Sequence, residues 1–150
     1  MCRARGFTLV ELMVVLAVLG LAGAAALLTM PPPDDPLASE ADRFGASLLH
    51  ARDEAILGTH TIEVTATAEG YGFTRRRFGR WDPLRQAPFG NVAWGDGIAP
   101  RLPTSRAQVG FRFEPTGATE PRALTLFHAG RSARIDVDGS GAVRVDVAAR

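Results

Sequence analysis

Residues that hold metals or close disulfides are scarce in this sequence. Cys2 is its single cysteine, so no disulfide within the chain and no cysteine-based metal site can form. His50, His60 and His128 lack the spacing of paired metal ligands. The sequence also lacks a Gly-x-Ser-x-Gly nucleophile elbow. We therefore expect a protein that is not an enzyme and that uses neither a metal nor a cofactor.

One segment, 136–141, has acidic residues spaced as in a calcium-binding loop. The glutamate that would bind the ion with both oxygens is missing, because Val147 stands at its position. The sequence Asp138-Gly139-Ser140-Gly141 also fits the turn of a β-hairpin, and we favour that interpretation.

Lysine is absent, and all 17 basic residues other than histidine are arginines. They nearly balance 16 acidic residues, so the formal net charge is +1 and no overall field favours nucleic acid. One cluster stands out, made of Arg75, Arg76, Arg77 and Arg80 with Trp81. It could contact an anion, a nucleic acid or a partner protein, because arginine pairs with phosphates and aromatic rings stack on bases. The alternative, which we favour, is a solvated hairpin end with Trp81 folded back on the core.

Charge is missing altogether from one long stretch, Leu12 to Met30. About 20 helical residues cross the apolar core of a bilayer, so this stretch predicts a transmembrane helix. Glu11 then lies about one turn inside the membrane, where a carboxylate costs at least about 2.5 kcal/mol and indicates a function. Arg3 and Arg5 precede the stretch and favour a cytoplasmic N-terminus. A cleaved signal peptide would explain the basic start, but it has no use for the acid.

The residues around Glu11 resemble a known processing site. Arg5-Gly6-Phe7-Thr8-Leu9-Val10-Glu11-Leu12 is similar to the class III leader and cleavage site of type IV pilins and type II secretion pseudopilins. The resemblance implies that a prepilin peptidase cuts between Gly6 and Phe7 and methylates the new N-terminus at Phe7. It also implies that Glu11 acts in subunit assembly.

The remaining chain changes from a helical to a strand period. Pro31-Pro32-Pro33 predicts a break, and Asp34, Asp35 and Pro36 are typical of a helix start. Apolar residues recur at helical spacing from Leu37 to Leu57, with Gly58 as the expected C-cap. Alternation then predicts strands, separated by a long surface excursion over 82–103 that holds one short strand near 98–102. The expected strands cover 62–67, 71–74, 109–113, 124–126, 135–137 and 143–147.

The soluble part resembles the H-type minor pseudopilin of type II secretion. The residues that are similar include Ala51-Arg52-Asp53-Glu54-Ala55-Ile56, Gly70-Tyr71-Gly72-Phe73 and Phe113-Glu114-Pro115-Thr116-Gly117. The expected fold class is α+β and type IV pilin-like: a membrane helix, a proline break, and an amphipathic helix packed on antiparallel β-sheet. The expected domains are a leader (1–6), a transmembrane helix (7–30), the proline break with the amphipathic helix (31–58), and a periplasmic antiparallel β domain (59–150).

The resemblance implies a minor pseudopilin, a tip-associated subunit of the periplasmic pseudopilus needed for protein export. Its implied partners are other minor and major pseudopilins, the prepilin peptidase and inner-membrane lipid, without nucleic acid. Its implied location is the inner membrane, crossed once, with the C-terminal domain in the periplasm. The alternative is a type IV pilus minor pilin that acts in pilus assembly or DNA uptake.

Replacing Gly6 should block processing. The peptidase site requires minimal bulk before the cut, so Gly6→Val should leave full-length precursor in the membrane. Intact-mass measurement on protein from a peptidase-positive strain checks this. A wild-type mass that shows no loss of the leader, or a cut near Ala24, would contradict the pilin resemblance.

Overall fold

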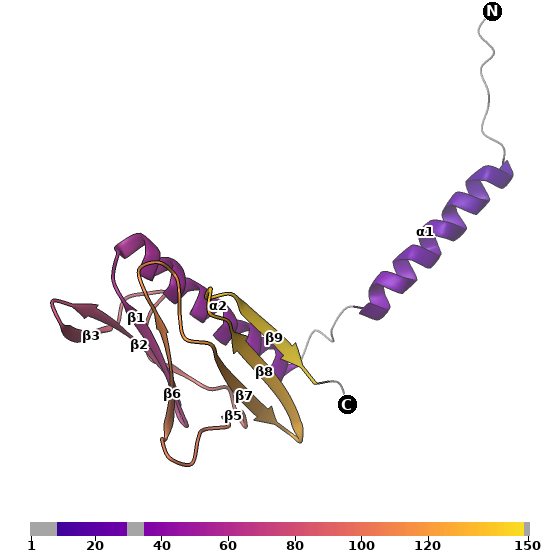
Figure 1. Ribbon diagram of the computed structural model, residues 1–150. Helices are drawn as coiled ribbons and strands as arrows, with labels where there is room; N and C mark the ends of the chain where they lie inside the picture. Colours follow the sequence, from indigo (N-terminus) through magenta and orange to yellow (C-terminus); the bar gives the residue numbers. More distant parts are fainter. Residues whose placement is uncertain (1–8, 30–34, 149–150) are drawn as a thin grey trace, which may run out of the picture. The chain divides into compact units, whose positions relative to one another are not determined.

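A computed structural model describes residues 9–29 and 35–148, with side chains described for 9–21 and 35–148. The chain divides into two compact units, Met1–Asp34 and Asp35–Arg150. The first contains helix α1 (Leu9–Thr29) (Figure 1). Gly6, Phe7 and the expected break at Pro31-Pro32-Pro33 lie outside the described residues. Within those residues, no helix combines the length and hydropathy of a membrane crossing.

The second unit begins with helix α2 (Pro36–Gly58), as its periodicity predicts. Asp35 caps its start: the Oδ1 atom accepts hydrogen bonds from the amides of Leu37 at 3.2 Å and Ala38 at 3.4 Å. Pro36 occupies the first turn, where a missing amide hydrogen is harmless. The expected cap at Gly58 is wrong by one residue. Thr59 takes the left-handed conformation instead, with φ of 52°, and its amide donates to the carbonyls of the last turn.

Two antiparallel sheets follow α2 (Figure 1). Sheet A has the order β3-β2-β1-β6, and β4 also pairs with β2; sheet B has the order β5-β7-β8-β9. The strands of sheet A are β1 (Ile62–Thr67), β2 (Gly70–Arg77), β3 (Arg80–Leu84), β4 (Val92–Ala93) and β6 (Gln108–Phe113). The strands of sheet B are β5 (Ala99–Pro100), β7 (Arg122–His128), β8 (Arg131–Val137) and β9 (Val143–Val147).

The six strands that alternation predicts are all present, and β5 matches the short strand expected near 98–102. We expected a surface excursion to begin at residue 82, which is too early in the chain. Residues 82–84 belong to β3, which pairs with β2. Four of the five β3 residues are exposed, so the strand has no buried face that would give it a period of two.

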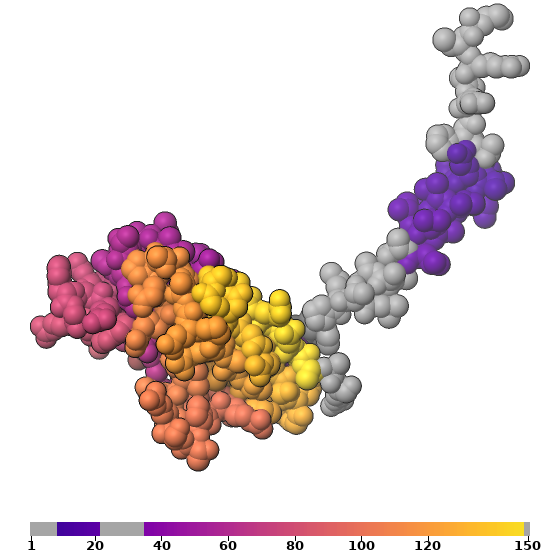
Figure 2. All heavy atoms as spheres, in the orientation of Figure 1, coloured from indigo at the N-terminus to yellow at the C-terminus, as the bar shows by residue number. Residues whose placement is uncertain are grey.

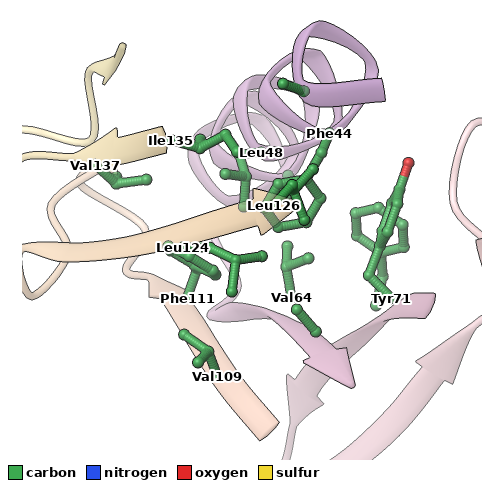
Figure 3. Packing of buried hydrophobic residues seen from close by; sticks show 14 of the residues in the cluster. Phe44, Leu48, Val64, Tyr71, Val109, Phe111, Leu124, Leu126, Ile135 and Val137 are labelled. Atoms are coloured by element: carbon green, nitrogen blue, oxygen red, sulfur yellow. The ribbon is translucent and has the colours of Figure 1, made fainter. Parts of the chain in front are cut away.

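The core lies between α2 and the inner faces of both sheets (Figure 3). Phe44 points from α2 into this space, and its ring centre lies 4.9 Å from Tyr71, 5.3 Å from Trp94 and 5.8 Å from Phe111. Edge-to-face packing at such distances is favourable beyond the area buried. Leu124, Leu126, Ala133, Ile135 and Val137 extend the core across sheet B.

Phe44→Ala should destabilise the second unit strongly. Phe44 is fully buried, so truncation removes apolar contacts and leaves a cavity, with an expected loss of about 3–5 kcal/mol in unfolding free energy. Urea denaturation of the fragment 35–150 measures it. Leu57→Ala is the matched control on the same helix: Leu57 is 83% exposed, and the expected change is within about 0.5 kcal/mol. Equal losses in the two variants would contradict the assigned core.

Candidate functional site

Helix α1 presents apolar side chains on every side. All residues from Leu9 to Leu21 are exposed, and Glu11, in the first turn, is their single acid. A helix that is apolar all round is ordinarily buried in lipid or among other helices. A negative charge in the first turn is favoured by the helix dipole. The expected cleavage residues Gly6 and Phe7 lie outside the described residues, so their geometry remains a prediction from the sequence.

The arginine cluster lies on the β2–β3 hairpin. In the register of the two strands Arg75 is opposite Asp82, Arg76 is opposite Trp81, and Arg77 is opposite Arg80. Phe78 and Gly79 form the two-residue turn, with φ angles of 48° and 80°. Positive φ at both positions is typical of a type I′ turn. The hairpin end that we favoured from the sequence is therefore present.

The hairpin divides its arginines between two faces. Side chains alternate along a strand, so Arg75 and Arg77 share the face of the buried Phe73, while Arg76 points to the opposite side. Cross-strand pairing puts Arg80 with the first group and Trp81 beside Arg76. The structure thus brings the predicted residues onto one hairpin but not onto one surface.

Trp81 does not fold back on the core, contrary to our expectation. Its exposed fraction is 38%, and the guanidinium of Arg112 lies 5.4 Å from its ring centre. Arg112 belongs to β6, at the other edge of sheet A, and its Nη2 also donates to Glu63 Oε2 at 3.2 Å. The ring therefore packs under an arginine on the outer face of the sheet. Sequence spacing could not show a contact between strands separated by two others.

Phe78, which lies among these arginines in the sequence, belongs to the same hairpin. It is 97% exposed at the tip of the hairpin, and the Arg77 guanidinium lies 6.0 Å from its ring centre. In the sequence, Phe78-Gly79 separates the run Arg75-Arg76-Arg77 from Arg80.

A buried polar cluster joins α2 to sheet A. Glu40 is 6% exposed, and both its carboxylate oxygens accept hydrogen bonds from Arg43 Nη2 at 2.7 Å. Arg43 also donates to the carbonyl of Ala93 at 3.2 Å, and the hydrogen bond with Glu40 raises the pKa of the Arg43 guanidinium. Burial raises the pKa of the Tyr71 hydroxyl, which lies 3.2 Å from Ser47 Oγ. Through Arg43, the buried carboxylate of Glu40 thus connects α2 to β4 of sheet A.

The acidic loop near Asp138 is a hairpin turn. Asp138 Oδ1 accepts from the amides of Ser140 at 2.8 Å and Ala142 at 3.1 Å, and from Ser140 Oγ. These bonds, that of the Ser140 hydroxyl first, lower the pKa of the Asp138 carboxyl. Over residues 9–29 and 35–148 no three acidic, histidine or cysteine side chains gather as a metal site would require.

A polar hollow of about 420 Å³ lies beside β6 and the start of β7. Its charged residues are largely paired with one another: Arg112 with Glu63 at 3.2 Å, and Arg122 with Glu120 at 2.8 Å. Both pairs are partly exposed, so each contributes at most about 1 kcal/mol. The arrangement neutralises the hollow and leaves no concentrated charge for a substrate.

Two family models match the chain. The prokaryotic N-terminal methylation motif matches residues 1–27, and the type II transport protein GspH matches residues 40–141. The comparison with curated proteins found no match.

Solved structures of related fold include two from secretion systems. The minor pseudopilin EpsH from the type 2 secretion system of Vibrio cholerae has a TM-score of 0.62 and 20% identity, covering 75% of this chain and 98% of that chain. Escherichia coli GspH has a TM-score of 0.59 and 21% identity, covering 73% and 86%. The type IV minor pilin FimU of Pseudomonas aeruginosa has a TM-score of 0.55 and 18% identity, covering 75% and 88%. These similarities establish a type IV pilin-like α+β fold.

The soluble fragment 36–150 should not bind DNA specifically. Its arginines lie on two faces of the hairpin and its charge is nearly balanced, so we expect no binding tighter than the non-specific range of about 10⁻⁴–10⁻⁶ M at physiological salt. Fluorescence anisotropy with labelled DNA measures this. The matched variant replaces Arg75, Arg76, Arg77 and Arg80 by Gln. Sub-micromolar binding that this variant loses would make DNA capture the leading function.

Proposed function

The chain belongs to the family of the type II transport protein GspH, and we propose that it is a minor pseudopilin of a type II secretion system. As a member of this family it is a structural subunit and not an enzyme. The observation that carries the proposal is the order of two segments in one chain: a methylation motif comes first, and the secretion-family domain follows it. A subunit of the periplasmic pseudopilus needs both, an anchor that is processed and a domain that contacts other subunits.

The proposed processing follows the leader motif. A prepilin peptidase removes residues 1–6 and methylates Phe7, which becomes the N-terminus. Residues 7–30 then anchor the protein in the inner membrane, and the domain from Asp35 lies in the periplasm. The basic pair before the charge-free stretch and the apolar surface of α1 support this orientation.

Glu11 is proposed to fix the position of the subunit in the filament. Once the leader is removed, the methylated ammonium at Phe7 stands four residues before Glu11 in the sequence and can pair with Glu11 of the same subunit or of a neighbour. An unpaired charge in lipid is costly, so pairing the two charges selects one register between helices. Small residues such as Gly20 and Gly23 allow the helices to approach closely.

The domain is proposed to contact other minor and major pseudopilins near the tip of the pseudopilus, a placement that rests on the resemblance to H-type subunits. The arginine cluster is then a partner contact. The similarity to FimU supports a second candidate, a type IV pilus minor pilin. DNA binding by the soluble fragment would favour that second candidate if it acts in DNA uptake.

Glu11→Leu should be inserted in the membrane and cleaved, but it should not assemble. The apolar replacement suits lipid, whereas the Phe7 ammonium loses its partner. Intact mass reports cleavage, and cross-linking to the other pseudopilins together with a secretion assay reports assembly. Val14→Leu, an apolar change within a turn of Glu11, is the control and should behave as wild type. Normal assembly of the Glu11→Leu protein would contradict the assigned role.

A further inference from the structure

The turn of the β2–β3 hairpin holds an aromatic ring that its own fold does not use. Phe78 has a φ of 48°, which is strained for a bulky residue and which Asn, Asp or Gly adopts more readily. Its side chain is 97% exposed, so the ring adds nothing to the core. The turn of the β7–β8 hairpin, Ala129-Gly130, has φ angles of 47° and 77°, so the chain builds this backbone elsewhere with a small side chain. A strained residue that the turn does not explain is a reason to look for a function.

The positive charge around this ring has no acidic counterpart at the tip. Arg76, Arg77 and Arg80 are exposed, and none of them forms an ion pair within the part of the chain that the structure describes. Arg77 lies directly opposite Arg80, and like charges in that position destabilise a strand pair. The acid of the hairpin, Asp82, lies opposite Arg75, further from the turn. The tip is thus an apolar ring among uncompensated cations.

These cations are distributed over both faces of the hairpin. Arg77 and Arg80 share one face, and Arg76 points to the other. Four of the five residues of β3 are exposed, and Figure 1 and Figure 2 show the hairpin at one end of the unit. A flat protein surface would contact one face and leave the cation on the other unused. A layer of lipid headgroups surrounds an inserted tip with phosphates, so it engages both faces.

We infer that the tip of the β2–β3 hairpin inserts into the surface of a membrane that contains anionic phospholipid. Phe78 enters the boundary between headgroups and acyl chains, where interfacial segments bury Phe, Trp and Leu side chains. Arg76, Arg77 and Arg80 bind the phosphates around the ring, since a guanidinium donates two parallel hydrogen bonds to such a group. Apolar burial and attraction to anionic lipid are the two terms on which interfacial binding depends.

One ring and a few cations bind a membrane weakly, because stable attachment ordinarily takes a second signal. The proposed anchor, residues 7–30, is that second signal, and in this respect the inference rests on the proposed function. A tether in the same membrane raises the effective concentration of the tip at its surface.

The contact belongs to the subunit that waits in the membrane before assembly. Helix α2 starts beside the linker to the anchor, and the hairpin lies at the other end of the Asp35–Arg150 unit (Figure 1). Attachment at both ends holds this unit against the membrane. Entry into the pseudopilus breaks the hairpin contact and frees the same arginines for the protein partners proposed above. A weak contact suits a state that the subunit must leave.

Photo-cross-linking from position 78 tests the contact on the full-length chain. Benzoylphenylalanine replaces Phe78, and the purified protein is reconstituted in vesicles of phosphatidylcholine with phosphatidylglycerol or of phosphatidylcholine alone. Lipid adducts should be severalfold more abundant in the anionic vesicles. The same analogue at Ala129 is the control, because this exposed turn lies beside Arg131, which pairs with Asp35 next to the linker. Its adducts report proximity to the bilayer and should not depend on phosphatidylglycerol.

A matched pair of double variants tests the charge. With the analogue at position 78, Arg77→Gln with Arg80→Gln should lower the adducts in anionic vesicles by about tenfold, since each arginine near an anionic surface contributes about fivefold in affinity. Arg106→Gln with Arg144→Gln removes the same charge from exposed sites outside the hairpin and should leave the adducts unchanged.

An environment-sensitive dye tests the ring. Asp82→Cys, in a chain with Cys2→Ser, carries the dye NBD on the exposed strand β3, three residues from the turn. Its emission should rise and shift to the blue in anionic vesicles. Phe78→Ala should remove most of this change, whereas Phe78→Trp should retain it.

Several results would overturn the contact. They are equal lipid capture with and without phosphatidylglycerol, a gain at position 129 equal to that at position 78, and an unchanged dye signal in Phe78→Ala. In cells that lack the other secretion subunits, capture of a protein instead of lipid at position 78 would also overturn it. Flotation of the chain with vesicles, cleavage at Gly6 and the assembly defect of Glu11→Leu do not involve the hairpin. They therefore report separately on the proposed function.

Discussion

Helix α2 must cover two sheets with one face, and the structure of the Asp35–Arg150 unit depends on this packing. The helix contacts β1 and β6 of sheet A and β7, β8 and β9 of sheet B. Phe44 fills the space toward sheet A, whereas Gly45 lets β9 approach the helix. A Cβ atom at Gly45 would lie 3.0 Å from Val145 Cγ2, so the methyl group of alanine would need the Val145 side chain to shift. A large and a small residue, adjacent in the sequence, thus set the distances to the two sheets.

The start of α2 is held by a charge that has two roles. Asp35 caps the helix, and its carboxylate also lies 2.8 Å from the guanidinium of Arg131 at the start of β8. Burial opposes ionisation of Asp35, but the hydrogen bonds from Arg131 and from the amides of Ala38 and Leu37 outweigh it and lower its pKa. The ion pair is therefore formed at neutral pH and is lost as the pH falls through the lowered pKa. It connects the first residue of the unit to sheet B.

Features with a local cause could be predicted from the sequence, and features that depend on distant pairing could not. Because α2 and the six regular strands are each buried on one side, their apolar residues recur at helical or two-residue spacing. The capping carboxylate of Asp35 and the missing amide hydrogen of Pro36 mark the helix start. By contrast, β3 is exposed on both faces and shows no period. Arg43, the ion-pair partner of the buried Glu40, also donates to the Ala93 carbonyl 50 residues away, and Trp81 packs under Arg112. These contacts exist only after the sheets have formed.

Glu11 and Phe78 share a physical property that distinguishes them from the core. A carboxylate within an apolar helix is unfavourable in lipid, and an aromatic ring in a strained, exposed turn is unfavourable in water. The exposed ring of Phe78 adds nothing to the core of its unit, and the pairing of Arg77 with Arg80 works against its own hairpin. A partner that supplies the opposite charge or an apolar surface removes these penalties, while a wrong partner leaves them in place. A subunit selects its neighbour by the difference in binding free energy between the correct partner and its competitors. A residue that is unfavourable in the isolated subunit increases this difference, because only the correct partner removes the penalty.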